Sequence, residues 1–417
     1  MRITARLTIP AALTAFALLA ATAWFILRPA GPLLRAASFG VAAISPNADG
    51  VADITTIQYE LARPANVSIY FIDSDERRFN FRTDRPRASG EYELLFSGIV
   101  EGFELPDEEV GGEILARVLP NGDYTWVIAA DNAEEQATLS GTLTIQEADT
   151  TLPDLHGFSI SPDLFTPNRD GISDRAWINM YLTKQASVMV SLIDDTGTQR
   201  PIAEQAGTIL PGEPGLHTFE YEGGVDLGAS PPPDGEYVVF ALAEDLLGQK
   251  VRAAGTLNIR FGGVPRADIV NATVEFEDTT VVLGDTLYFT LTVENYGVTP
   301  IRTTGPEPEF IYLQDENANT HGWFDESGAW RVGIDCDVCI RDYPWRWALG
   351  TAVNLTKIGE HYYLMPGQRA TIQGGITITE EPARNPLYFW AGLIHEDVAV
   401  SNVNNRVDPH FITIVTP

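Results

Sequence analysis

Basic residues and cysteine are scarce in this 417-residue sequence. Only 27 Lys and Arg stand against 57 Asp and Glu, which gives a formal net charge of −30. Nucleic acids and anionic membrane surfaces are also negatively charged, so this imbalance argues against both as partners. The two cysteines are too few for a zinc site of their own, because zinc would need two further ligands. An acidic surface of this kind suits an exported protein, or one that collects divalent cations.

Catalytic motifs are also missing. The sequence has neither a nucleophile elbow nor a glycine-rich phosphate loop. His395-Glu396 begins like a zinc-protease helix, but the second histidine is absent. We therefore expect a protein that is not an enzyme.

Helical periodicity is almost absent after residue 37. The one long apolar run, 7–27, has 21 uncharged residues and is flanked by arginines on both sides. A helix of this length rises about 31 Å, enough to cross a membrane. A cleavable signal peptide has a shorter apolar region, and small-residue sites at 21–23 and 35–37 suit cleavage. A membrane anchor and a signal peptide both stay open, and in either case we expect the bulk to be exported.

One nine-residue pattern occurs twice and gives two opening loops. S-P-N-A-D-G-V-A-D at 45–53 returns as T-P-N-R-D-G-I-S-D at 166–174. The two copies stay in ungapped register over 47–73 and 168–194. This duplication predicts two copies of one folding unit.

The segments between these loops are short, alternating and rich in β-branched and aromatic residues. Such strands, separated by Gly, Pro, Asn and Asp, are typical of immunoglobulin-type β-sandwiches. Both copies close alike, with P-N-G-D-Y at 120–124 and P-D-G-E-Y at 233–237. We expect the Asn-Gly and Asp-Gly pairs to form tight hairpins, and Tyr124 and Tyr237 to point into or cap the core.

This order of motifs resembles the Ig-like repeats of flagellar hook-capping proteins and the related gliding-motility C-terminal modules. The resemblance covers about residues 39–260 and implies an extracellular structural or spacer module. Two features depart from the family pattern. The W-D-G usual in mid-module is F-S-G at 96–98 and Y-E-G at 221–223, and the first copy carries an acidic insertion at 101–113.

The opening loops carry side-chain oxygens at alternate positions with a glycine at the turn, as calcium loops do. The candidate calcium ligands are Asn47, Asp49, Asp53, Asn168, Asp170 and Asp174. They form only half a coordination shell, because the bidentate glutamate of a full loop is missing. The alternative is an Asx-type turn in which these side chains cap backbone amides. Calcium is the one cofactor that the sequence suggests.

The pattern changes after a Gly/Pro hinge at 260–265. We expect strands at 267–276 and 287–295. The V-E-N-Y-G strand end at 293–297 and the L-M-P-G-Q turn at 364–368 resemble the cell-adhesion-related Ig-like domains of bacterial exported proteins. This resemblance spans about 267–417 and implies adhesion or ligand presentation outside the cell.

An aromatic insertion, 310–347, interrupts this last module. Candidate ligand-binding residues are Trp323, Trp330, Trp345, Trp347 and Arg346. Exposed tryptophan rings would stack on sugars or grip a partner. The alternative is that they pack the insertion, and on a strand Trp345 and Trp347 would share one face.

Cys336 and Cys339 lie three residues apart. In an exported protein such a pair most simply forms a local disulfide. Free thiols, a redox pair and a zinc site with His321 and His361 are the alternatives.

Together these patterns predict an all-β chain of tandem immunoglobulin-like β-sandwiches preceded by one N-terminal transmembrane or signal helix. The expected boundaries are an anchor or signal peptide at 1–37, Ig-like repeats at 38–149 and 150–264, and a C-terminal Ig-like domain at 265–417. We expect a non-catalytic cell-envelope stalk that presents a C-terminal adhesion or ligand-binding module to an envelope protein or polysaccharide. The alternatives are a carbohydrate-binding protein that uses the tryptophan-rich insertion, and a subunit of a surface layer or filament.

Overall fold

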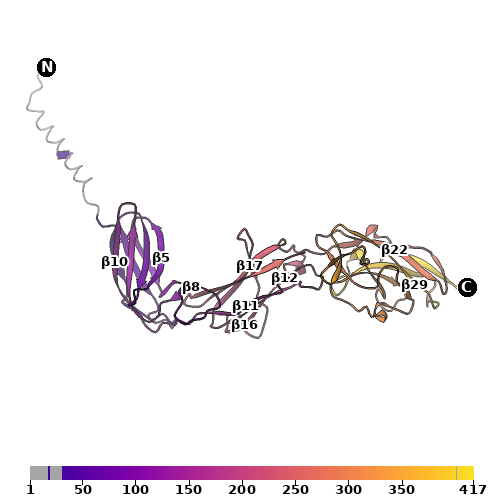
Figure 1. Ribbon diagram of the computed structural model, residues 1–417, viewed down its shortest axis with the longest axis horizontal. Coiled ribbons are helices and arrows are strands. Elements are labelled where there is room, and N and C mark those ends of the chain that lie inside the picture. The colour runs from indigo at the N-terminus through magenta and orange to yellow at the C-terminus, as the bar shows by residue number, and fades with distance from the viewer. Residues whose placement is uncertain (1–16, 19–30, 401) are drawn as a thin grey trace, which may run out of the picture.

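The computed structural model describes residues 17–18, 31–400 and 402–417. Figure 1 shows three β-rich bodies in a row, with a bend between the first and the second. The expected N-terminal transmembrane or signal helix lies, apart from residues 17–18, outside this part of the chain. Across the described residues, no helix has the length and apolar character needed to span a membrane.

The first sandwich packs a three-stranded sheet, in the order β1-β3-β6, against a five-stranded sheet, in the order β2-β10-β9-β4-β5. Ile57, Tyr59 and Leu61 alternate inward along β3, which is the period of two that the sequence predicts. The core already includes Leu33 and Leu34, so this sandwich begins before residue 38. Its strands are β1 (Leu34–Phe39), β2 (Ala43–Ile44), β3 (Thr55–Leu61), β4 (Ala65–Ile72), β5 (Arg78–Arg87), β6 (Gly90–Phe96), β9 (Gly122–Asp131) and β10 (Gln136–Ile145).

The second sandwich repeats this plan. A three-stranded sheet, β11-β13-β16, faces a sheet in the order β15-β14-β17-β18, which is extended by β8 and β7. β7 and β8 flank the acidic insertion of the first repeat, so a segment of the first repeat completes a sheet of the second sandwich. The strands are β7 (Ile99–Glu101), β8 (Glu113–Val118), β11 (Leu155–Ser161), β12 (Leu164–Phe165), β13 (Ala176–Leu182), β14 (Ser187–Ile193), β15 (Gln199–Ile202), β16 (Gly215–Tyr221), β17 (Gly235–Glu244) and β18 (Lys250–Ile259).

The third sandwich is larger. One sheet has the order β19-β22-β29-β24 and the other β21-β31-β30-β25-β23-β28-β27, with β26 paired to β25. The expected strand 267–276 is broken, because Asn271 and Ala272 adopt positive φ angles. The strands are β19 (Ala267–Ile269), β20 (Glu275–Phe276), β21 (Thr280–Val282), β22 (Thr286–Asn295), β23 (Ile301–Thr303), β24 (Ile311–Leu313), β25 (Trp330–Cys336), β26 (Trp345–Ala348), β27 (Thr356–Ile358), β28 (His361–Leu364), β29 (Arg369–Thr377), β30 (Leu387–His395) and β31 (Val407–Val415).

The same strand order recurs in all three bodies. A short strand pairs in parallel with the last strand of its sandwich, as β2 with β10, β12 with β18, and β21 with β31. The last strand then pairs with the one before it, which pairs with a central strand. Two packed sheets in this order form an Ig-like sandwich. The chain is therefore all-β with tandem Ig-like sandwiches, as predicted.

Tyr124 and Tyr237 cap their cores, which confirms the prediction for both. Their hydroxyls donate to the carbonyls of Pro120 (2.9 Å) and Pro233 (2.8 Å), which is the tyrosine corner of Ig-like folds. The prediction of tight hairpins at the Asn-Gly and Asp-Gly pairs is wrong, because neither pair adopts positive φ angles. The chain instead crosses from one sheet to the other at this corner, so no tight turn is needed.

Candidate functional sites: two interdomain joints and a distal groove

The first opening loop is held by Asp53. Its carboxylate accepts hydrogen bonds from the amides of Asn47 (3.1 Å), Ala48 (3.0 Å) and Gly50 (2.8 Å), and the bond from Asn47 is the main cause of its lowered pKa. The side-chain oxygens of Asn47 and Asp49 each accept from the amide two residues further on. Oxygens that face N–H groups in this way form an Asx turn.

The second opening loop makes the same turn but is buried against the third sandwich. Asp174 accepts from the amides of Asn168 (3.0 Å) and Gly171 (2.7 Å). The Asp170 side chain accepts a hydrogen bond from the Tyr363 hydroxyl of the third sandwich at 3.0 Å. Burial raises the pKa values of Asp170 and Asp174.

These hydrogen bonds are those of the Asx-turn alternative in both loops, and calcium binding there stays a prediction. Within the described ranges, no three His, Cys, Asp or Glu side chains are grouped to hold a metal ion. The structure instead gives the second loop a role that the sequence did not indicate, as a docking element between sandwiches.

Arg302 lies at the centre of this second joint and is only 2% exposed. Its Nε donates to the Asp170 carbonyl at 2.7 Å, and Nη2 donates to the Ser327 carbonyl at 2.6 Å. Nη1 forms an ion pair with Glu326. Because Asp170 belongs to the second sandwich and Arg302 to the third, one buried guanidinium holds both sandwiches. Charged hydrogen bonds of this kind are strong and directional.

His395 makes a second contact across the same joint. Its Nε2 lies 2.8 Å from the Arg169 carbonyl, to which it donates, and its ring stacks on Trp330 with centroids 4.4 Å apart. Burial lowers the pKa of His395 to about 4, so the ring is neutral near pH 7. The backbone of Gly328 also packs tightly against the second sandwich, since a Cβ at this position would lie 2.1 Å from the Asp170 carbonyl carbon.

The first joint is built around Gln249, which is fully buried. Its amide nitrogen donates to the carbonyls of Asp149 (3.2 Å) and Thr151 (2.9 Å) in the linker, and its oxygen accepts from the Val118 amide (3.3 Å). Lys184 of the second sandwich pairs with Asp149 at 2.8 Å. The first repeat, the linker and the second sandwich thus share one polar network.

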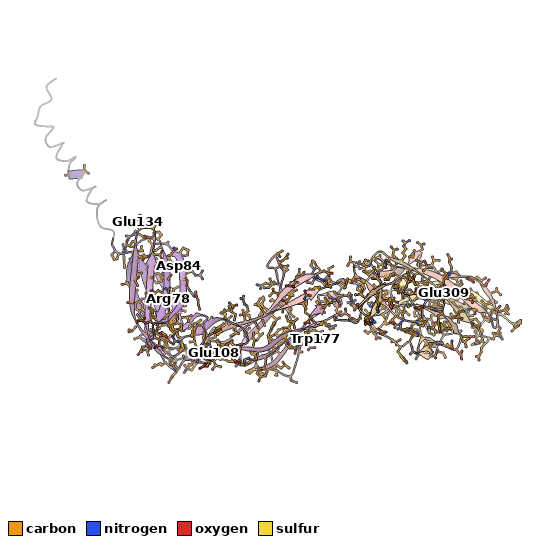
Figure 2. The ribbon with its side chains drawn as sticks, viewed as in Figure 1. Arg78, Asp84, Glu108, Glu134, Trp177 and Glu309 are labelled. Atoms are coloured by element: carbon orange, nitrogen blue, oxygen red, sulfur yellow. A yellow bond between two sulfur atoms is a disulfide. The ribbon has the colours of Figure 1, made fainter. Side chains whose placement is uncertain are left out.

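The acidic insertion completes this first joint. Arg117, 1% exposed, donates to Glu108 at 2.8 Å and to the Thr150 carbonyl at 3.1 Å. The bond to Arg117 is also the main cause of the lowered pKa of Glu108. β8 pairs with β18 of the second sandwich, as in Arg252 opposite Glu113. Figure 2 labels Glu108 at the bend between the two sandwiches.

The predicted tryptophan platform is largely a core. Trp330, Trp345 and Trp347 are 7%, 3% and 0% exposed, and only Trp323, at 38%, presents a sizeable surface. Trp345 and Trp347 share one face of β26, as predicted, but that face points inward. Arg346 is also structural, since its Nη1 lies 2.8 Å from Glu396 Oε2. The packing alternative therefore describes these residues better than a sugar-binding surface.

Cys336 and Cys339 are joined by a disulfide. The disulfide loop forms one wall of a groove of about 420 Å³, here called the distal groove. The apolar residues that line it include Val338, Ile340, Trp345, Pro382, Leu387 and Phe389, and Asp315, Glu316 and Arg341 add charge. Ile414 also lines it, which places the groove toward the C-terminal end of the molecule, far from the first sandwich (Figure 1).

No protein-family model and no curated protein matches the chain. Similar solved structures include a two-domain fibronectin type-III segment of chicken tenascin, with 11% identity, coverage of 54% of this chain and 98% of that chain, and a TM-score of 0.18. A structure from a 1.5-MDa bacterial ice-binding adhesin has 11% identity and a TM-score of 0.22, and the match covers 93% of this chain and 100% of the adhesin chain. Extracellular domains 3–5 of Drosophila OTK have 10% identity, coverage of 93% and 99%, and a TM-score of 0.19. Similarities this weak carry no argument about function, so the Ig-like assignment rests on the strand order.

Proposed function

We propose that this protein is a non-catalytic, exported component of the cell envelope, in which three Ig-like sandwiches form a stiff stalk. The N-terminal apolar segment directs the chain to the membrane, and the stalk holds the third sandwich away from it. The observation that carries this proposal is Arg302, a buried guanidinium that bonds the backbone of two sandwiches at once.

A chain of independent domains would not need such joints. Contacts between domains in one chain are commonly small and allow relative motion. Here Gln249 and Arg302 are buried in polar networks at the two joints, and β8 of the first repeat pairs with β18 in a sheet of the second sandwich. Opening either joint would exchange these buried hydrogen bonds for bonds to water, at a net cost in free energy for each bond. This supports a stalk with a fixed geometry.

The location is tested by cell fractionation with intact-mass measurement of the native protein. Full mass in the membrane fraction, with the third sandwich cleavable by protease added to intact cells or spheroplasts, indicates a tethered stalk. A shorter mass in the medium or periplasm indicates release after signal cleavage. Full mass in the cytosol would contradict export.

A second candidate function is ligand capture at the distal groove. Ile340 is fully exposed beside the groove, and Val338 is 36% exposed, so the disulfide loop presents apolar side chains to solvent. Apolar concave surfaces with a few polar groups are typical ligand sites. The neutral probe N-phenyl-1-naphthylamine should bind saturably to the full chain, and Val338→Asp should abolish binding. Probe binding unchanged by Val338→Asp would argue against this candidate.

A further inference from the structure

The edge strand β5 of the first sandwich carries an unusual arginine strip. Four of its ten residues are arginine, at positions 78, 82, 85 and 87. β5 ends the strand order of its sheet, so no strand is hydrogen-bonded to one side of it. Figure 2 labels Arg78 and Asp84 on this strand, along the side of the first sandwich. We refer to these four residues as the arginine strip.

The strip has no acidic partner within ion-pair distance in the described part of the chain, although the sequence has 57 acidic residues. Asp84, the one acid of the strand, bonds with the Ser68 hydroxyl instead. Burial lowers the pKa of Arg82, and repulsion from Arg85 and Arg87 lowers it further, while Glu101 offsets part of this. A group of mutually repelling cations is unfavourable on its own.

Aromatic rings back three of the four guanidinium groups. The Cζ of Arg78 lies 3.7 Å from the ring centroid of Tyr70, and that of Arg82 lies 4.1 Å from Phe81. Arg87 lies 5.5 Å from the Tyr92 centroid. Such cation–π contacts hold a guanidinium against the ring face. Arg78 Nε donates to Asn80 Oδ1 at 2.8 Å, and Arg82 Nη1 donates to the Phe81 carbonyl at 2.9 Å. The other N–H groups of these two guanidinium groups can bind carboxylate or phosphate.

Protection of a sheet edge explains only part of this arrangement. Edge strands use charge, proline and bulges to prevent pairing with another chain. Pro86 and two irregularities in the β4–β5 register already do this. Edge protection does not require three arginines to be fixed on aromatic rings.

We propose that the arginine strip binds an extended anionic polysaccharide of the cell envelope, which rests on the proposed export of the chain. Arg82, Arg85 and Arg87 lie opposite Ile69, Val67 and Ala65 of β4, so these three share one face at the sheet edge, whereas Arg78 lies opposite Ile72 on the other face. The five residue steps from Arg82 to Arg87 span about 16 Å along a strand. A polymer with regularly spaced carboxylates or phosphodiesters can lie along it and contact several arginines at once. The rest of the acidic surface repels such a polymer, so contact is confined to this strip.

The test uses the full chain in non-ionic detergent and three polymers. Polygalacturonate carries carboxylates, poly(glycerol phosphate) carries phosphodiesters, and dextran is neutral. The wild-type chain should bind at least one of the two anionic polymers, with an affinity that falls as salt rises, and should not bind dextran. Which anionic polymer binds identifies the charged group.

The variant Arg82→Gln with Arg85→Gln should weaken this binding by about tenfold or more, because two charged contacts are lost. Both side chains are exposed, so folding should be unaffected. The matched control is Arg200→Gln with Arg266→Gln, which removes two exposed arginines from the other sandwiches and should stay within about twofold of wild type.

Three results would overturn the proposal. One is that neither anionic polymer binds. Another is that the control variant loses as much affinity as the strip variant, which would mean that only net charge matters. The third is salt-sensitive self-association, measured by sedimentation, that the strip variant abolishes while polymer binding is absent. That result would assign the strip to a second copy of the chain. Failure of export would appear in fractionation and would leave these binding measurements unchanged.

Discussion

At the scale of single residues, His395 and Asp335 are both buried in the third sandwich, and burial shifts their pKa values in opposite directions. The pKa of His395 falls from 6.5 to about 4, and that of Asp335 rises from 3.8 to about 6. As pH falls from 6.5 to 4, the unfolded histidine takes up a proton before the folded one, so stability decreases. As pH rises from 3.8 to 6, the unfolded aspartate loses its proton first, so stability also decreases. The two effects partly cancel between pH 4 and 6.

Asp335→Asn removes one of these two effects. At pH 7 the free energy of unfolding of the variant should be about 3 kcal/mol higher than that of the wild type, so the variant is more stable, and the difference should disappear below pH 4. Its amide oxygen can still accept the Cys336 amide hydrogen bond that Asp335 accepts now. Chemical denaturation between pH 3.5 and 8 measures this. Asp342→Asn, on an exposed side chain, is the control, and an equal gain at pH 4 and pH 7 would contradict the assignment.

The two tyrosine corners offer a matched pair of substitutions. Tyr124→Phe and Tyr237→Phe each remove one buried hydrogen bond and should each lower the free energy of unfolding by about 1–2 kcal/mol. Tyr181→Phe, at a residue that is 51% exposed, should change it little. Thermal or chemical denaturation gives the comparison. Equal effects of all three substitutions would mean that the corner bonds do not stabilise the sandwiches.

The sequence predicted some residue roles and missed others for physical reasons. Alternation placed Trp345 and Trp347 on one face, but alternation alone does not say whether that face meets solvent. The opening loops fit two chemistries, since an oxygen-rich turn can face a cation or its own amides. Arg302 gave no signal at all, because its partner Asp170 lies 132 residues earlier.

At the scale of elements, β8 is the strand that joins the first two sandwiches. The acidic insertion before β8 looked like an idiosyncratic loop, because nothing local indicates that the partner strand of β8 belongs to the next repeat. The first strand after the hinge was also misjudged, since positive φ angles at Asn271 and Ala272 break a pattern that otherwise suits a strand. Strands with strong alternation, such as β3 and β22, were predicted well.

Gly112→Val tests the role of β8. A Cβ at Gly112 would lie 2.5 Å from the Arg252 carbonyl oxygen, so the side chain forces β8 away from β18. Hydrogen exchange of the β8 amides should accelerate, and the second sandwich should melt at a lower temperature. Gly207→Ala is the control, because the nearest atoms there lie 4.0 Å away. Unchanged exchange in Gly112→Val would mean that β8 contributes nothing to the joint.

At the scale of the whole molecule, the number and order of the sandwiches followed from the repeat and from the change of pattern after residue 260. The joints did not, because they depend on contacts between segments far apart in sequence. Figure 1 shows the result, an extended molecule with its first sandwich at one end and its third at the other. A stalk of this form requires that the joints stay closed in solution.

Arg302→Ala should open the second joint. It leaves the Asp170 and Ser327 carbonyls without their donor and creates a small void between the sandwiches. The second and third sandwiches should then melt independently, whereas we expect them to melt together in the wild-type chain. Differential scanning calorimetry separates the two cases, and a single shared transition in the variant would count against the role of Arg302.

The stiffness of the second joint is tested most directly by pulsed electron spin resonance. Asp195→Cys and Val353→Cys place exposed spin labels on the second and third sandwiches of the full chain, with the native disulfide kept. We predict one narrow distance distribution, which becomes broad when Arg302→Ala is added. A distribution in the otherwise wild-type chain that is already as broad as in the Arg302→Ala variant would contradict the stiff stalk.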